Sequence, residues 1–110
     1  MTEPWTTITA LAHRFDAVDA ALGMQPEESH TLQILKIGEE FGEAAQAVIG
    51  VKGTNPRKGN SHTWDDVHDE VADVVITAMV ALARMRPDAA GYFARQLRLK
   101  AATFLPEDSA

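Results

Sequence analysis

Apolar residues recur along this chain at the three- and four-residue spacing that is typical of helices. No segment shows the sustained alternation that predicts a strand. The pattern predicts four helices, over residues 5–22, 29–49, 63–85 and 87–104. The predicted fold class is therefore all-α, with a four-helix bundle-like domain that spans residues 1–110.

Residues that favour helix ends set the expected boundaries. Ser29 is a candidate N-cap of the second helix, and Gly50 is expected to close it. The loop over residues 51–62 is the clearest break in the helical pattern. Thr63 is expected to cap the third helix, and acidic residues in the first turn suit the positive end of the helix dipole.

The apolar stripe of each helix predicts the core. For the first three helices it consists of Ile8, Leu11, Ala12, Phe15, Val18 and Leu22, then Ile34, Ile37, Phe41, Ala44, Ala45 and Val48, and finally Val67, Val71, Val74, Val75, Ala78 and Leu82. From Val71 onward the third helix is apolar nearly all the way round, which indicates that it is enclosed on every side. Because four short helices supply few neighbours, we expect a homodimer or homotetramer with this helix near the interface.

Composition narrows the class of protein. The chain of 110 residues is 45% apolar and 24% charged, as expected for one soluble globular domain. It has no cysteine, which excludes disulfides, zinc-thiolate sites and cysteine nucleophiles. Its net charge of -6 argues against a general nucleic-acid-binding surface. The N-terminus lacks a signal-peptide layout and no apolar run is long enough to span a bilayer, so we expect a cytoplasmic protein with no membrane partner.

Carboxylates lie at matched spacing on the second and third predicted helices. Residues three or four apart share a helix face, so Glu40 and Glu43 form one acidic stripe beside the apolar stripe. Glu70 and Asp73 form another, with Asp73 inside an otherwise apolar run. If the two helices pack side by side, we expect these four carboxylates to meet.

Converging carboxylates need a cation, because like charges repel and unpaired buried carboxylates are costly. Mg²⁺, or Mn²⁺ in its place, is the natural occupant of an all-oxygen site that also takes water and phosphate oxygens. A di-iron bundle is the competing interpretation, but it needs Glu-x-x-His on two helices, and this chain offers only Glu27 to His30, near a helix start. A solvated acidic face is the alternative without a metal.

Basic residues near the acidic stripes are candidates for phosphate contacts. Lys36, one turn before Glu40, fits an ion pair and a phosphate contact about equally well. Lys52, Arg57 and Lys58 in and beside the loop are either solvated charges or, as a group, ligands of a polyphosphate.

Two motifs carry a family resemblance. They are Glu39-Glu40-x-x-Glu43, within Lys36-Ile37-Gly38 and Phe41-Gly42-Glu43-Ala44, and Glu70-x-x-Asp73. Over about residues 33–82 the chain resembles the MazG-like nucleotide pyrophosphohydrolases of the all-α NTP pyrophosphatase superfamily. The resemblance implies a Mg²⁺-dependent enzyme that cleaves a nucleoside triphosphate between the α and β phosphates, releasing nucleoside monophosphate and pyrophosphate. It also implies an oligomer built from paired helical bundles.

The resemblance also implies residue roles. Glu40, Glu43, Glu70 and Asp73 would be the metal ligands, and Glu39 would be a further ligand or the catalytic carboxylate that orients and deprotonates the attacking water. Such chemistry requires positioning and charge stabilisation rather than a side-chain nucleophile. Two alternatives stay open: a non-catalytic oligomeric module that binds metal or nucleotide, and a phosphoribosyl-ATP pyrophosphohydrolase.

Overall fold

Four helices make up the regular structure of the chain. The computed structural model describes residues 3–107, and within this range it contains no strand. The helices are α1 (Trp5–Ala21), α2 (Pro26–Lys52), α3 (Trp64–Met85) and α4 (Ala89–Phe104). The all-α prediction is therefore confirmed, and each expected helix is present, with the largest shift at α2, which begins and ends three residues outside the expected bounds.

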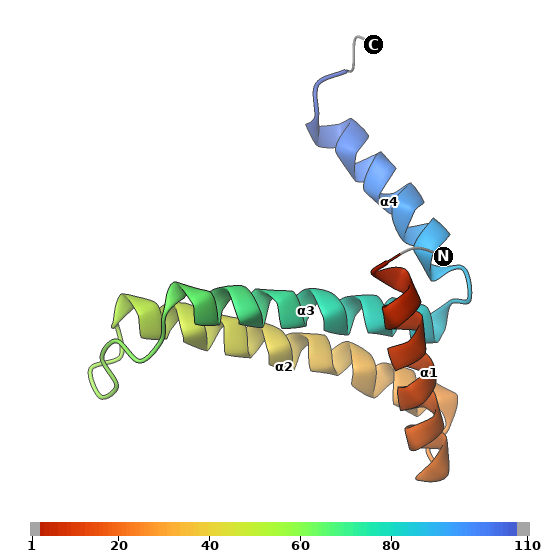
Figure 1. Cartoon of the computed structure of the whole chain (residues 1–110), viewed down its shortest axis with the longest axis horizontal. Helices are drawn as coiled ribbons and strands as arrows, with labels where there is room; N and C mark the ends of the chain where they lie inside the picture. Colours follow the sequence, from red (N-terminus) through yellow and green to blue (C-terminus); the bar gives the residue numbers. More distant parts are fainter. Residues whose placement is uncertain (1–2, 108–110) are drawn as a thin grey trace.

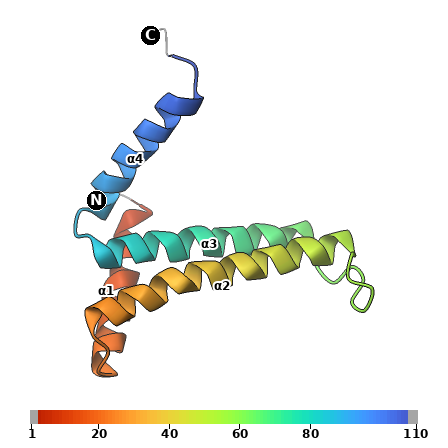
Figure 2. The ribbon, with the colours of Figure 1, turned by 180° about the vertical axis from the view of Figure 1, so that it is seen from behind.

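The helices form an open arrangement rather than a closed globule. α2 and α3 run antiparallel as a long hairpin, α1 crosses the hairpin at the end away from the loop, and α4 projects outward from that same end (Figures 1 and 2). The radius of gyration is 17.4 Å, whereas a compact chain of this length has about 13 Å. Much of the outer surface of the hairpin and of α4 is therefore left uncovered by the described part of the chain.

The start of α2 differs from the prediction. Ser29 is not its N-cap: the helix begins at Pro26, and Gln25 precedes it in an extended conformation. Proline fits this first position because its fixed φ suits a helix and its missing N–H needs no partner there. Ser29 lies inside the helix, is buried, and contributes its hydroxyl to a polar network described below.

The end of α2 also lies beyond the predicted residue. Gly50 does not close the helix, which continues to Lys52 and ends at Gly53 with a left-handed φ of 66°. Gly50 is buried where the returning chain crosses the helix. A Cβ atom there would lie 2.0 Å from Nδ1 of His62, so glycine at this position permits a close approach rather than a helix end.

The start of α3 is as predicted. Thr63 is the N-cap and forms a capping box with Asp66: the Asp66 N–H donates to Thr63 Oγ1 at 3.3 Å, and the Thr63 N–H donates to Asp66 Oδ2 at 2.9 Å. The hydrogen bond from the Thr63 backbone N–H, followed by hydrogen bonding with the Thr63 side chain, holds the pKa of Asp66 below its ordinary value.

The core is small and lies where α1 crosses α3. Its buried centre consists of Ile8, Ala12 and Val80. Along the hairpin, α2 and α3 meet through small buried residues, among them Ala44 and Ala47 on α2, which let the two backbones approach closely.

Several predicted core positions are wrong for a single chain. Ile8, Ala12, Ala44 and Val67 are buried as expected. More than a third of the surface is exposed at Phe15, Val18, Leu22, Ile34, Phe41, Val48, Val71 and Val75. The reason is geometric: one hairpin covers each helix on one side only. Among the described residues, no helix combines the length and the apolar character that a membrane span requires.

Candidate metal centre

Three of the predicted ligands converge between α2 and α3. Glu40 and Glu43 lie one turn apart on α2, and Glu70 faces them from α3. One carboxylate oxygen from each lies within 4.8 Å of the others. The alanines that follow on α2 allow this approach by keeping the two helices close. Three oxygen ligands from rigid helices leave room for water and phosphate oxygens around a hard divalent cation.

The electrostatics of this group favour a cation. The neighbouring carboxylate of Glu40, and to a smaller extent that of Glu70, raises the pKa of Glu43 above its ordinary value. Oε2 of Glu70 is buried and has no hydrogen-bond partner. A buried carboxylate oxygen without a donor is unfavourable unless something positive lies beside it. The three side chains therefore fit a divalent cation better than they fit one another.

Asp73, the fourth predicted ligand, lies outside this group. It follows Glu70 by one turn on α3, and it is exposed. The expectation that an apolar surrounding encloses Asp73 is wrong for a single chain, because Val71, Val75 and Ile76 around it are also exposed.

Lys36 borders the carboxylates and forms an ion pair, one of the two roles expected from its spacing, while the phosphate contact stays a prediction. Its Nζ lies 3.4 Å from Glu40 Oε1 and 3.7 Å from Glu39 Oε1. The charge of Glu39 and the hydrogen bond with Glu40 raise the pKa of Lys36, so it remains a cation. The Glu39 side chain is 65% exposed and lies at the rim of the group. Its role as the catalytic carboxylate stays a prediction.

The basic residues near the loop lie apart from the carboxylates. Lys52 is nine residues after Glu43, about 14 Å along the helix axis, and its Nζ lies 5.7 Å from the centre of the Trp64 ring. Arg57 and Lys58 are exposed. Lys58 borders a small polar cavity of about 160 Å³ at the base of the loop. In one chain, only Lys36 of the four predicted phosphate ligands adjoins the carboxylates.

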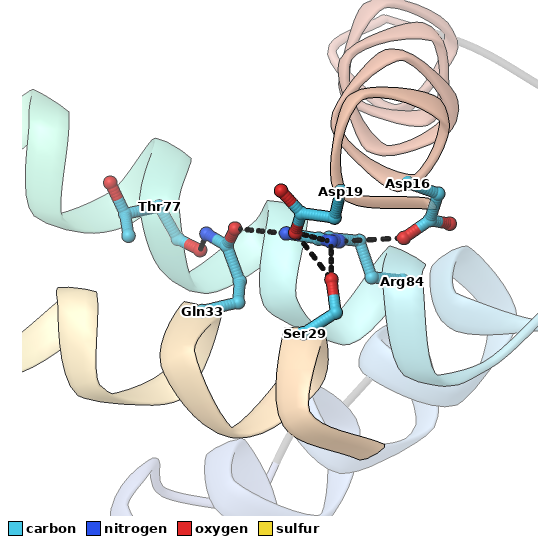
Figure 3. A network of polar contacts seen from close by, with 6 residues as sticks. All are labelled: Asp16, Asp19, Ser29, Gln33, Thr77 and Arg84. Atoms are coloured by element: carbon cyan, nitrogen blue, oxygen red, sulfur yellow. Dashed lines mark hydrogen bonds and ion pairs between the residues drawn. The ribbon is translucent and has the colours of Figure 1, made fainter. Parts of the chain in front are cut away.

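A buried arginine joins three helices, and the sequence had not indicated it (Figure 3). The side chain of Arg84, on α3, is 3% exposed. It donates to Asp16 at 2.7 Å and Asp19 at 2.6 Å on α1, and to Gln33 at 2.8 Å on α2. It also donates to the hydroxyl of Ser29, which in turn donates to Asp19. The network attaches α1 to the hairpin.

The charged groups in this network shift one another's pKa values toward the ionised forms. Burial lowers the pKa of Arg84, but its hydrogen bonds to Asp19 and Asp16 raise it by more. The hydrogen bond from Ser29, followed by that from Arg84, lowers the pKa of Asp19. The available signal in the sequence was Asp16 and Asp19, one turn apart on the first helix, together with a lone arginine near the end of the apolar third helix.

A cavity of about 370 Å³ lies between α1, α2 and α3. Its lining is mostly apolar and includes Leu11, Phe15, Val18, Met24, Leu32, Ile76 and Val80. Arg84 and Gln33 form a polar part of its wall, where the Gln33 amide donates to the carbonyl oxygen of Thr77 at 3.3 Å. Lys36 also lines the cavity. Since Lys36 contacts Glu40, the cavity and the carboxylates adjoin each other.

Comparison with known proteins gives no relative for this chain: no protein-family model, no curated protein and no solved structure matches it.

Proposed function

We propose that this protein is a Mg²⁺-dependent nucleoside triphosphate pyrophosphohydrolase, for which Mn²⁺ can replace Mg²⁺. The observation that carries the proposal is the convergence of Glu40, Glu43 and Glu70, with a buried, unpartnered oxygen on Glu70. Converging carboxylates, one of which keeps a buried oxygen without a donor, are a poor device for stability and a suitable one for holding a hard cation.

Each of the site residues would have a separate role. Glu40, Glu43 and Glu70 would hold the ion, with Asp73 turning in as a fourth ligand. When bound, the ion would neutralise charge on the phosphate oxygens and activate a water molecule. Glu39 at the rim accepts a proton as the oxygen of water bonds to the α-phosphorus. The anhydride bond between the α and β phosphates then breaks, and pyrophosphate leaves.

The cavity beside Lys36 would hold the nucleoside. Its volume of about 370 Å³ lies in the range of small-molecule sites, and such sites combine apolar walls with a few polar groups. Lys36 stands between the cavity and the carboxylates, which suits a cation that contacts a phosphate oxygen while the base lies among apolar side chains. The triphosphate would have to extend toward the loop, or the loop would have to move toward the carboxylates, before it could contact Lys52, Arg57 and Lys58.

The test is pyrophosphate release from a panel of canonical and modified nucleoside triphosphates, with phosphoribosyl-ATP included, in the presence of Mg²⁺. We expect at least one substrate to be hydrolysed, and Glu43→Gln to abolish release while the helical circular dichroism spectrum is retained. Asp69→Asn, an exposed change on the same helix as Glu70, is the control and should retain activity. No release from any substrate would overturn the proposed enzyme. Calorimetric binding of metal and nucleotide without product would indicate a non-catalytic module.

A further inference from the structure

The cavity between α1, α2 and α3 has two sides that are held in different ways. α2 and α3 supply one side, and small buried residues along the hairpin keep these two helices close together. α1 supplies the other side with Leu11, Phe15, Val18 and Asp19. The position of α1 therefore sets the width of the cavity, and the contacts that fix α1 determine which ligand the cavity admits.

Apolar packing fixes only the first half of α1. Ile8 and Ala12 are its buried residues, and with Val80 of α3 they form the apolar core. Beyond Ala12 the helix has no buried residue, and the cavity-lining Phe15 and Val18 are 40% and 39% exposed. Apolar contacts therefore attach the second half of α1 only weakly, although this half carries most of the cavity wall.

Arg84 attaches this second half of α1. Its Nε donates to Asp16 at 2.7 Å and its Nη2 donates to Asp19 at 2.6 Å, and the two aspartates lie one turn apart on α1. A guanidinium is planar and its donors point in fixed directions, so two hydrogen bonds to one helix set both the rotation and the height of that helix. Phe15 and Val18 directly precede the two aspartates, so the same bonds set their places in the cavity wall.

α2 holds the guanidinium from the other side (Figure 3). Nη1 donates to Gln33 at 2.8 Å, Nη2 also donates to the Ser29 hydroxyl, and the Gln33 amide donates to the carbonyl oxygen of Thr77 on α3. The Arg84 side chain is 3% exposed, and Ser29 and Gln33 are buried. A buried side chain with partners on both sides is held in one position. α1 is therefore attached to a rigid part of the hairpin.

Stability alone does not explain this network. Burying charges is costly, and replacing a buried ion pair by apolar residues of similar volume is often neutral or stabilising. Apolar contacts are not directional, however, so they would let α1 slide and rotate where hydrogen bonds do not. The network also adjoins the cavity, because Asp19, Ser29, Gln33 and Arg84 all line it. This location favours a role in shaping the cavity wall.

The network lies far from the carboxylates of the candidate metal centre. Arg84 follows Glu70 by fourteen residues on α3, about 21 Å along the helix axis. Gln33 lies one turn before Lys36, on the side of the cavity away from those carboxylates. A change in the network should therefore move the wall of the cavity and leave the metal ligands in place.

We propose that Arg84 is a positioning residue, which through Asp16 and Asp19 holds the second half of α1 as one wall of the nucleoside cavity. The identity of the ligand rests on the proposed function, whereas the attachment of α1 is independent of it. Loss of the network should weaken the binding of the nucleoside triphosphate without slowing its hydrolysis once it is bound.

Steady-state hydrolysis of the best substrate from the nucleotide panel, with Mg²⁺, tests the effect on binding. Asp16→Ala is the cleaner variant, because Asp16 contacts Arg84 without lining the cavity and its side chain is 43% exposed, so the chain should still fold. We expect KM to rise about fivefold for Asp16→Ala and about tenfold or more for Arg84→Met, with kcat changed by less than about twofold. The double variant should be no worse than Arg84→Met alone, because both changes break the same network.

Asp88→Ala is the matched control for these variants. It also removes an aspartate from an ion pair with an arginine, at 2.8 Å from Arg86, but this pair is exposed and lies outside the cavity. Its KM should equal that of the wild type. An unchanged KM in Asp16→Ala and Arg84→Met, or a fall in kcat alone, would overturn the proposal.

Distances between paired spin labels test the position of α1 without any nucleotide. Labels attached to Ala17→Cys on α1 and Asp69→Cys on α3 are unambiguous, because both positions are exposed and the chain has no cysteine of its own. Excess unlabelled protein ensures that only distances within one chain are measured. We expect one narrow distance distribution, which is broader or shifted in Asp16→Ala and unchanged in Asp88→Ala.

The two experiments separate this inference from the proposed function. An unchanged distance distribution in Asp16→Ala would overturn the positioning role of Arg84, whatever the enzyme does. A wild type that hydrolyses no substrate would contradict the proposed function, and the spin-label distances would still decide whether Arg84 positions α1.

Discussion

The Glu70→Gln variant tests whether repulsion between the carboxylates of α2 and α3 lowers the free energy of unfolding until a cation binds. The substitution removes one negative charge and nearly preserves the size of the side chain. The carboxylate oxygens lie within 4.8 Å of one another. At this upper limit, two unit charges repel by about 1 kcal/mol at the dielectric constant of water and by about 3 kcal/mol at an effective constant of 20. Because Glu70 and Glu40 are both partly exposed, the lower figure applies. Without metal, the variant should therefore be more stable than the wild type by on the order of 1 kcal/mol.

Magnesium should reverse this order. A ligand at a hundred times its dissociation constant stabilises the folded state by about 2.7 kcal/mol, and the wild type should gain this while Glu70→Gln gains much less. The assay is urea unfolding in EDTA and again in saturating Mg²⁺, at one fixed protein concentration because association also affects stability. Asp69→Asn should behave as the wild type in both buffers. A variant that is less stable than the wild type in EDTA would show that the three carboxylates do not oppose folding, and equal stabilisation of both proteins by Mg²⁺ would show that Glu70 does not hold the ion.

Further predictions concern the polar network and the cap of α3. Arg84→Met should lower the free energy of unfolding by about 3 kcal/mol, because it leaves the buried Ser29 and Gln33 and the partly buried Asp19 without this donor. Arg14→Met on the exposed side of α1 should change it by less than about 0.5 kcal/mol. Chemical denaturation measures both. Since the pKa of Asp19 lies below its ordinary 3.8, its stabilisation is present above that pH and is lost as the pH falls through the lowered pKa. The stability gap between the wild type and Arg84→Met should therefore narrow from pH 7 to pH 3, and an unchanged gap would contradict the assignment. Thr63→Ala should cost about 1 kcal/mol through loss of the capping box, measured by the same method, and a neutral result would show that Asp66 does not depend on the cap.

Local features of the chain were predictable from sequence. Helical periodicity depends on neighbouring residues, and it located all four helices. The cap at Thr63 depends on two residues three apart and was correct for the same reason. The convergence of Glu40, Glu43 and Glu70 followed from matched spacing on two helices that pack side by side.

Features that depend on distant segments were not predictable in the same way. Ser29 has the residue type of an N-cap, but a proline three residues earlier starts the helix, and the arginine that Ser29 contacts is 55 residues away. Phe41 and Val71 have the spacing of core residues, yet the described residues leave them 65% and 49% exposed. Periodicity identifies an apolar face and does not tell whether the same chain or a second copy buries it.

The most direct test of the metal centre is an anomalous difference map from crystals of the protein grown with Mn²⁺. We predict one or more anomalous peaks between α2 and α3, with carboxylate oxygens of Glu40, Glu43 and Glu70 as ligands. Crystals that diffract well and contain saturating Mn²⁺, yet show no peak within reach of these three side chains, would contradict it.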